Sequence, residues 1–326
     1  MSGYIPSLES VAKGTFASVA GFSTLSLGLL YYGQNYLIYP SSFPPGSRTE
    51  VSVPSAFGLP YEELALETPD RVKVRAYVLV QRKDLAQGES VVLQGKGSSG
   101  MSDDEYAATR PTIVMFHGNG GNFGHRIPLA KMFYVELRCN VFMLSYRGYG
   151  LSEGSPSEKG IRMDAQTSLD YLTTHPVLSK TKIVLYGQSI GGAVAIDLAS
   201  RNPSKIHALI LENTFLSLPR LIPTAMPLLS RVAFLCHQKW DTASKVPLIP
   251  SQTPILLLSG AKDEVVPRAH MVELERLVRG DPEKRGHGFG LKRPGQIVEF
   301  PEGAHNDTCI QRGYWNAVAT FIDRYC

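Results

Sequence analysis

The chain has 326 residues, enough for one large domain with appendages, and its 43% apolar content supplies ample material for a buried core. The net charge of +4 is mild and the basic residues are scattered, apart from pairs at 284–285 and 292–293, so we expect no nucleic-acid binding. The four cysteines (Cys139, Cys236, Cys309 and Cys326) include no C-x-x-C pair and no His/Cys pair at metal-binding spacing, and we expect neither a metal nor another cofactor.

The N-terminal part contains a long apolar stretch. Residues 14–47 include no Asp, Glu, Lys or Arg, and the apolar centre at 16–32 reaches the roughly 17–25 residues that a membrane-spanning helix needs. Tyr31, Tyr32 and Tyr36 follow at its far end, where interfacial aromatic residues gather. We therefore expect a single-pass membrane anchor in residues 1–33. A cleaved signal peptide and a helix packed on the body are the alternatives.

The remainder, residues 34–326, predicts one α/β domain. Segments 34–40, 61–66 and 72–80 resemble an opening run of antiparallel strands, and later strands alternate with helices such as 161–174. This alternation predicts a mostly parallel central sheet with helices on both faces. Two polar segments, 83–110 and 281–295, are expected to be loop insertions.

One turn in this domain carries a catalytic signature. The apolar run at 183–186 is followed by Gly-Gln-Ser-Ile-Gly-Gly at 187–192 and then by a helix-like stretch. Strand, G-x-S-x-G and helix is the arrangement of a nucleophile elbow, which presents its serine on a strained turn. Ser189 is thus the expected nucleophile of a serine hydrolase. An ordinary strand–helix turn that contains a serine is the alternative.

An acid and a base follow the serine in chain order. Asp263 lies just after the apolar strand 254–260, and His305 lies just after the short strand 297–300. Loops at the carboxyl ends of parallel strands share one edge of the sheet, so both side chains are expected near Ser189. His305 would act as general base and Asp263 would orient its imidazole.

Other acids and histidines compete for these two roles. Glu264, Asp307 and above all Glu212, which ends another strand, are the alternative acids. Among the other histidines, His117 precedes the nucleophile and His287 lies in a glycine-rich basic loop, so structural or solvent roles suit them better; His125 is the third competitor.

A glycine-rich loop supplies the expected oxyanion hole. His-Gly-Asn-Gly-Gly-Asn at 117–122 follows the strand 111–116. The backbone N–H of Asn119, with Gly120 as substitute, is expected to join that of Ile190 in stabilising the negative charge of the reaction intermediate. A phosphate-binding loop is not supported, because no Gly-Lys-Ser/Thr follows.

The segment between two strands, about 214–250, is apolar and interrupted by prolines. In this position it would overhang the elbow as a small helical lid, with Phe215, Leu216 and Trp240 lining an apolar substrate pocket. Ordinary packing of these helices on the sheet is an equally acceptable interpretation. A lid would indicate a substrate with a fatty acyl chain or a similar apolar group.

Together with the motifs at 147–150 and 212–215, these segments resemble the bud-emergence (BEM-type) branch of the α/β-hydrolase superfamily. The resemblance runs from about Gly33 to the C-terminus. It implies the α/β-hydrolase fold, an N-terminal membrane anchor, and Ser189, Asp263 and His305 as nucleophile, acid and base. It also implies location in the endoplasmic reticulum or plasma membrane.

Several functions remain open at this stage. The first is a membrane-anchored hydrolase of carboxylic esters or thioesters, with a protein S-depalmitoylase as its leading form, because some relatives act on S-palmitoylated proteins. A lysophospholipase-like lipid esterase, a serine peptidase and a non-enzymatic membrane scaffold are the alternatives. A dehalogenase or epoxide hydrolase is disfavoured, since its nucleophile would be Asp at position 189.

Overall fold

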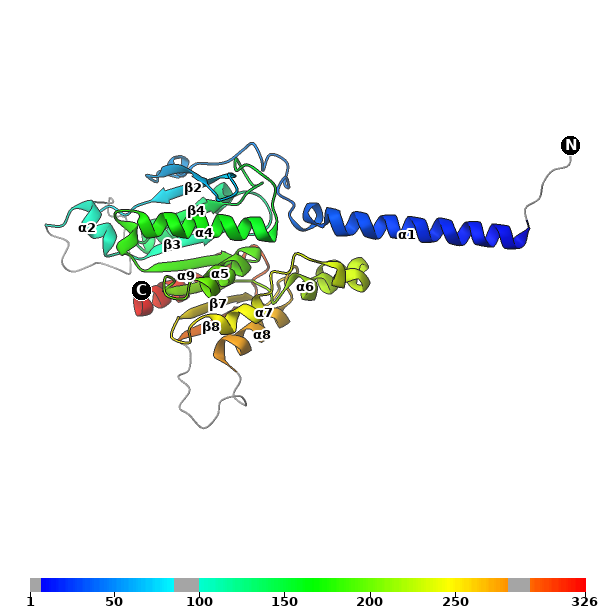
Figure 1. The fold of residues 1–326 in the computed structure, drawn as a ribbon. Helices are drawn as coiled ribbons and strands as arrows, with labels where there is room; N and C mark the ends of the chain where they lie inside the picture. The colour runs from blue at the N-terminus through cyan, green and yellow to red at the C-terminus, as the bar shows by residue number, and fades with distance from the viewer. Residues whose placement is uncertain (1–6, 85–99, 281–293) are drawn as a thin grey trace.

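A computed structural model describes residues 7–84, 100–280 and 294–326. An eight-stranded sheet of order β1-β2-β4-β3-β5-β6-β7-β8 forms the centre of the body (Figure 1). Its strands are β1 (Glu62–Glu67), β2 (Lys73–Leu79), β3 (Thr112–Phe116), β4 (Asn140–Ser145), β5 (Ile183–Gln188), β6 (Ala208–Glu212), β7 (Ile255–Gly260) and β8 (Gly295–Phe300).

The sheet is parallel from β4 to β8, whereas β1 and β2 pair in antiparallel fashion, and β2 also runs antiparallel to β4. The central strands β3 to β7 are buried along their whole length, as expected for parallel strands covered on both faces. This confirms the predicted α/β-hydrolase architecture, and it places the loops after β3, β5, β6, β7 and β8 on one edge.

Helices cover both faces of the sheet because alternate strand residues point to opposite sides. Val114 packs in the core beneath one group of helices and its neighbour Ile113 in the core beneath the other. The first group is α4 (Glu158–Thr174), α5 (Ile190–Arg201) and α8 (Arg268–Arg279); the second is α3 (Ile127–Lys131) and α9 (Tyr314–Tyr325). Short helical turns lie at η1 (Pro54–Phe57), η2 (Phe123–Arg126), η3 (Met132–Glu136), η4 (Leu178–Lys180) and η7 (Thr308–Ile310).

The N-terminal helix α1 (Leu8–Ile38) extends away from the body (Figure 1). Its portion Lys13–Ile38 is long and apolar enough to cross a membrane. The prediction of a strand at 34–40 was wrong, because the helix continues to Ile38. Gln34 explains the continuation: its side-chain amide donates to the Tyr31 carbonyl at 2.8 Å, and its carbonyl accepts the backbone N–H of His237 at 2.9 Å.

The segment between β6 and β7 forms the short helices expected from its prolines. They are α6 (Leu218–Ala225), η5 (Pro227–Leu235), α7 (Thr242–Lys245) and η6 (Val246–Leu248). Of the two expected loop insertions, residues 85–99 and 281–293 lie outside the described residues. Within the first, however, Asp103–Ala108 forms helix α2, because Ser102 and Glu105 make a reciprocal capping box that the polar composition concealed.

Candidate active site

Ser189 occupies the turn between β5 and α5 with a left-handed backbone, φ +55° and ψ −121°. Such a conformation is unfavourable for a residue with a side chain, and it persists only where the surroundings fix it. Here the Ser189 N–H donates to the Glu212 carbonyl at 2.9 Å, and the Ser189 carbonyl accepts the Thr214 hydroxyl at 2.7 Å. Strand β6 and the residues after it therefore hold the strained turn from one side.

The two glycines of the turn are required by close backbone contacts. A Cβ atom on Gly187 would lie 2.2 Å from the Gly191 carbonyl oxygen, and one on Gly191 would lie 2.0 Å from the Phe116 carbonyl oxygen. The second contact seats the start of α5 directly against the end of β3. The elbow and the glycine-rich loop that follows β3 are thereby held beside each other.

The structure brings Asp263 and His305 together. His305 Nδ1 lies 2.8 Å from Asp263 Oδ2, and Asp263 Oδ1 accepts the backbone N–H groups of Val265 and Val266 at 2.9 and 2.7 Å. A carboxylate fixed in this way favours the tautomer of His305 that carries its proton on Nδ1, which leaves Nε2 as an acceptor. Both Ser189 and His305 line the same cavity.

Two amide side chains hold the backbone of His305, and sequence reasoning missed this role for both. The His305 carbonyl accepts from Gln188 Nε2 at 2.9 Å and from Asn213 Nδ2 at 3.2 Å. Asn213 Nδ2 also donates to the Thr308 hydroxyl at 2.9 Å, while its Oδ1 accepts the Gly260 N–H at 2.8 Å. The available signal was an asparagine placed directly after a buried strand, a residue that tolerates the φ of +44° found here.

The rival acids have other partners. The Glu264 carboxylate accepts the backbone N–H of His305 at 3.2 Å, and Asp307 Oδ1 accepts the Ala304 N–H at 2.6 Å within the turn. Glu212 is fully buried and its Oε2 accepts the hydroxyls of Tyr186 and Tyr314 at 2.7 and 2.5 Å. None of the three carboxylates is hydrogen-bonded to the His305 ring among the described contacts, whereas Asp263 is.

The rival histidines are likewise engaged elsewhere. His117 is buried, its Nδ1 lies 2.8 Å from the Gly118 carbonyl, and burial lowers its pKa to about 3. His125 Nδ1 accepts the Asn122 N–H at 3.4 Å at the start of η2. His287 lies outside the described residues. His117 is therefore a neutral core side chain beside the site.

The glycine-rich loop is held by its side chains and leaves backbone donors free. Asn119 Oδ1 accepts the Tyr149 hydroxyl at 2.7 Å, and Asn119 Nδ2 donates to the Ile38 carbonyl. Within the described part of the chain, the backbone N–H groups of Asn119, Gly120 and Ile190 have no internal partner, and all three residues line the cavity. These are the three donors expected from the sequence.

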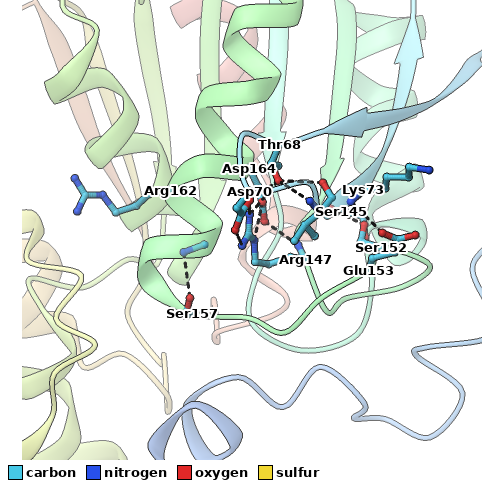
Figure 2. Close-up of polar contacts among 12 residues, drawn as sticks. Thr68, Asp70, Lys73, Ser145, Arg147, Ser152, Glu153, Ser157, Arg162 and Asp164 are labelled. Atoms are coloured by element: carbon cyan, nitrogen blue, oxygen red, sulfur yellow. Dashed lines mark hydrogen bonds and ion pairs between the residues drawn. The ribbon is translucent and has the colours of Figure 1, made fainter.

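Arg147, two residues before Tyr149, belongs to an ion network with Asp164 and Asp70 (Figure 2). The Arg147 guanidinium bonds to Asp164 at 2.9 Å and to Asp70 at 2.7 and 3.0 Å, and the Arg147 N–H donates to Asp164 at 2.8 Å. Breaking the buried pair of Arg147 and Asp164 would cost about 3–5 kcal/mol, because one charge would be left without a partner. Through Tyr149, the Arg-Gly-Tyr-Gly motif at 147–150 thus supports the glycine-rich loop.

A cavity of about 500 Å³ opens in front of Ser189. Its floor is formed by the loop residues Asn119 and Gly120 together with Ser189 and His305, and its walls come from three elements: α1, α6 and η5. Wall residues are mostly apolar, and they include Leu37, Ile38, Leu221, Ile222, Leu229 and Val232. This volume and lining suit a ligand with an extended apolar group.

The pocket residues expected from the sequence need one correction. Phe215 lines the cavity, whereas Leu216 and Trp240 are buried behind it and are not among its lining residues. Trp240 points its indole N–H at the Tyr39 hydroxyl, 2.9 Å away, and so ties the lid to the end of α1. The apolar pattern of this segment did not predict the direction of each side chain.

No cluster of three or more His, Cys, Asp or Glu residues suitable for a metal occurs in residues 7–84, 100–280 and 294–326. All four cysteines are free.

Comparisons with known proteins agree with this geometry. Residues 111–233 match the family described as the alpha/beta hydrolase fold. The chain is 42% identical to protein bem46 of Schizosaccharomyces pombe, over 99% of this chain and 97% of that protein. It is 33% identical to the alpha/beta hydrolase domain-containing protein WAV2 of Arabidopsis thaliana, over 98% of this chain and 96% of that protein. The chain belongs to the Bem46 branch of the α/β-hydrolase fold proteins.

Two further similarities extend the comparison. A Saccharomyces cerevisiae relative named an uncharacterized membrane protein is 38% identical over 97% of this chain and 98% of its own length. Among solved structures, an alpha-beta hydrolase from Vibrio vulnificus superposes with a TM-score of 0.64 at 17% identity, over 88% of this chain and 92% of that one. The Pyrococcus furiosus esterase Pf2001 gives 0.61 at 17% identity, over 86% and 97%. At these identities the structures show a shared fold.

Substitution of Gly191 by Ala tests the contact between the elbow and β3. The added Cβ would meet the Phe116 carbonyl at 2.0 Å, so we expect the free energy of unfolding to fall by at least about 3 kcal/mol, or folding to fail. Chemical denaturation in detergent measures the loss. Gly120→Ala is the control, since its Cβ has no neighbour closer than 4.0 Å; equal losses in the two variants would contradict the proposed packing.

Substitution of Glu212 by Gln separates a buried structural carboxyl from a catalytic one. Burial raises the pKa of Glu212, so the fold favours its protonated form, and native stability falls as pH rises through the folded-state pKa. Glu212→Gln keeps an acceptor for Tyr186 and Tyr314 but cannot ionise. We expect it to remain active and to lose this part of the pH dependence in thermal unfolding, at pH values above the ordinary glutamate pKa of about 4.3. If the stability of the wild type and of the variant depended on pH in the same way, or if the variant were folded but inactive, the structural role of Glu212 would be contradicted.

Proposed function

We propose that this protein is a membrane-anchored serine hydrolase of carboxylic esters or thioesters, with Ser189 as nucleophile, His305 as general base and Asp263 as the acid that orients it. The observation that carries the proposal is the 2.8 Å contact of Asp263 with His305, which lines the same cavity as Ser189 on its strained turn. Strained serine, paired histidine and free backbone donors together fit acyl transfer.

In the first half of the reaction His305 Nε2 takes the proton of Ser189 Oγ as this oxygen attacks the acyl carbon. The resulting tetrahedral oxyanion is bound by the backbone N–H of Ile190 and that of Asn119, with Gly120 as substitute. Each such donor contributes about 3–4 kcal/mol to transition-state stabilisation. When the intermediate collapses, the leaving alcohol or thiol receives the proton from His305 and departs, and the acyl group remains bonded to Ser189.

In the second half a water molecule replaces the leaving group. His305 takes one of its protons, the hydroxyl attacks the acyl carbon, and collapse of the second intermediate returns the proton to Ser189 Oγ and releases the carboxylic acid. Asp263 stabilises the imidazolium in both halves and keeps the Nδ1 proton directed toward itself. Gln188 and Asn213 hold the backbone carbonyl of His305 and so support the loop that carries the ring.

The apolar walls of the cavity support a fatty acyl group as the part of the substrate that is bound there. A palmitoyl thioester on a protein is our leading substrate, which makes the protein an S-depalmitoylase. A lysophospholipid offers the same acyl chain to the same cavity and is the second candidate. Both are hydrolysed by the same chemistry, so the leaving group alone separates them.

Helix α1 supports the membrane anchor. Its span Lys13–Ile38 contains 26 residues, and at about 1.5 Å per residue it is longer than the roughly 30 Å hydrocarbon core of a bilayer. The yeast relative named a membrane protein aligns with 97% of this chain. We place residues 1–33 in the anchor and 34–326 in the hydrolase domain, with the lid at about 214–250. We propose that the protein resides in the endoplasmic reticulum or the plasma membrane.

The nucleophile assignment is tested by fluorophosphonate labelling of the full-length protein in detergent, with Ser189→Ala beside the wild type. We expect labelling and hydrolysis of acyl esters in the wild type only, because the probe reacts with an activated serine. Ser152→Ala, at a buried serine outside the cavity, is the control. Labelling that persists in Ser189→Ala would reject Ser189 as nucleophile, and an unreactive, folded wild type would favour a non-enzymatic scaffold.

The acyl-chain assignment is tested by Phe215→Ala. Phe215 lines the cavity, so we expect kcat/KM to fall about tenfold or more for palmitoyl thioesters and esters, and much less for acetyl esters. Leu216→Ala is the matched control, because Leu216 is the next residue in the chain and is also buried, but it does not line the cavity. If Phe215→Ala lowered kcat/KM equally for long-chain and short-chain substrates, the cavity would not be the binding site of the acyl chain.

A further inference from the structure

Both α1 and the lid line the cavity, and both elements also carry exposed apolar side chains. On the lid, Leu228 is 99% exposed, Phe234 is 76% exposed and Met226 is also exposed; we call these three residues the lid tip. On α1, Leu29, Tyr32 and Tyr36 are exposed. Figure 1 shows α6 at the end of the body from which α1 leaves. Exposed large apolar groups gathered in this way mark a surface that binds something apolar.

The lid and the helix are joined by specific contacts, so they occupy a fixed relation to each other. Gln34 Nε2 reaches the Leu235 carbonyl at 3.4 Å and Gln34 Oε1 accepts the N–H groups of His237 and Gln238. One turn further, Tyr39 donates to Gln238 Oε1 at 3.0 Å and accepts from Trp240. Wherever α1 is placed in a bilayer, the lid is placed with it.

The length of α1 indicates that depth. Counted from Gly14, just after Lys13, to Tyr32 among the tyrosines at its far end, the helix spans about 28 Å, close to the roughly 30 Å of a hydrocarbon core. With this span in the bilayer, Gln34 and the cavity-lining residues Leu37 and Ile38 emerge at the surface of the membrane, with the lid beside them. This part of the cavity is then at the level of the lipid headgroups.

Charge on the lid favours the same partner. Residues 214–250 contain four basic residues, Arg220, Arg231, Lys239 and Lys245, and one acidic residue, Asp241. Basic side chains beside an apolar surface are attracted to anionic lipid headgroups by about 1 kcal/mol each near the membrane. A lipid bilayer offers both the apolar depth for the lid tip and the negative surface for these cations.

We infer that the lid tip penetrates the bilayer beside α1, and that the acyl chain of the substrate passes sideways from the lipid into the cavity between α1 and the lid. The identity of the substrate in this inference rests on the proposed function. The contact between the lid tip and lipid is independent of it. On this inference, the substrates are acyl chains that are embedded in the membrane rather than dissolved in water. The last turns of α1 then form a wall of the substrate-binding site.

Lipid contact is measured directly by fluorescence. Full-length Phe234→Trp is reconstituted in nanodiscs of phosphatidylcholine and phosphatidylserine, with or without brominated acyl chains, and its signal is compared with that of the parent, which has two native tryptophans. We expect the bromine atoms to quench the added tryptophan. Met101→Trp is the control, because Met101 is exposed beside α2, at the end of the body opposite α1 (Figure 1). Equal quenching at the two positions, or none at Phe234, overturns the inference.

Substrate access is measured with the double variant Leu228→Asp, Phe234→Asp, whose positions lie outside the cavity lining. We expect kcat/KM toward palmitoyl thioester embedded in vesicles to fall about tenfold or more, with the rate on dissolved acetyl ester unchanged. Met101→Asp should change neither rate. An equal change on both substrates, or an unquenched tryptophan together with a cross-linked dimer through the lid tip, overturns bilayer access. A folded wild type that fluorophosphonate does not label would instead reject the proposed function, and the quenching result would still decide lid insertion.

Discussion

The hydrogen bond from the Ser189 N–H to the Glu212 carbonyl is the constraint on which the site depends, because it holds a residue at φ +55° that would otherwise relax. It acts with the Thr214 hydroxyl on the Ser189 carbonyl and with the close packing of Gly191 on β3. Three neighbouring strands thus fix one turn, and all three are buried along their length. The strain at the serine is offset by the stability of the sheet centre.

The same strand end also positions His305. Asn213 follows Glu212 directly, and its side chain joins the end of β7 to the loop of His305 through bonds to Gly260, Thr308 and His305 itself. The Glu212 carbonyl binds the elbow and the Asn213 side chain binds the histidine loop, so two successive residues connect Ser189 to His305.

Sequence reasoning predicted the parts of this arrangement that depend on local patterns. The apolar strands, the G-x-S-x-G turn and the chain order of Ser189, Asp263 and His305 were sufficient to predict the fold. They also selected Ser189 and His305, which line one cavity, and Asp263, which contacts the His305 ring. Long-range contacts were not accessible. Trp240 was expected to face the substrate, but its partner Tyr39 lies some two hundred residues away in the chain, and nothing local indicated it. The continuation of α1 through Gln34 depends on the lid in the same way.

Contact between α1 and the glycine-rich loop gives the proposed anchor a role beyond attachment. The Ile38 carbonyl, at the last residue of α1, accepts from Asn119, whose backbone N–H is a proposed oxyanion donor. Tyr149 holds the other side of the Asn119 side chain, and Arg147, two residues before it, pairs with the buried Asp164. Asn119 is therefore held between the Tyr149 loop and the end of α1. If α1 spans a membrane as proposed, a force that tilts this helix acts on the glycine-rich loop through one side chain.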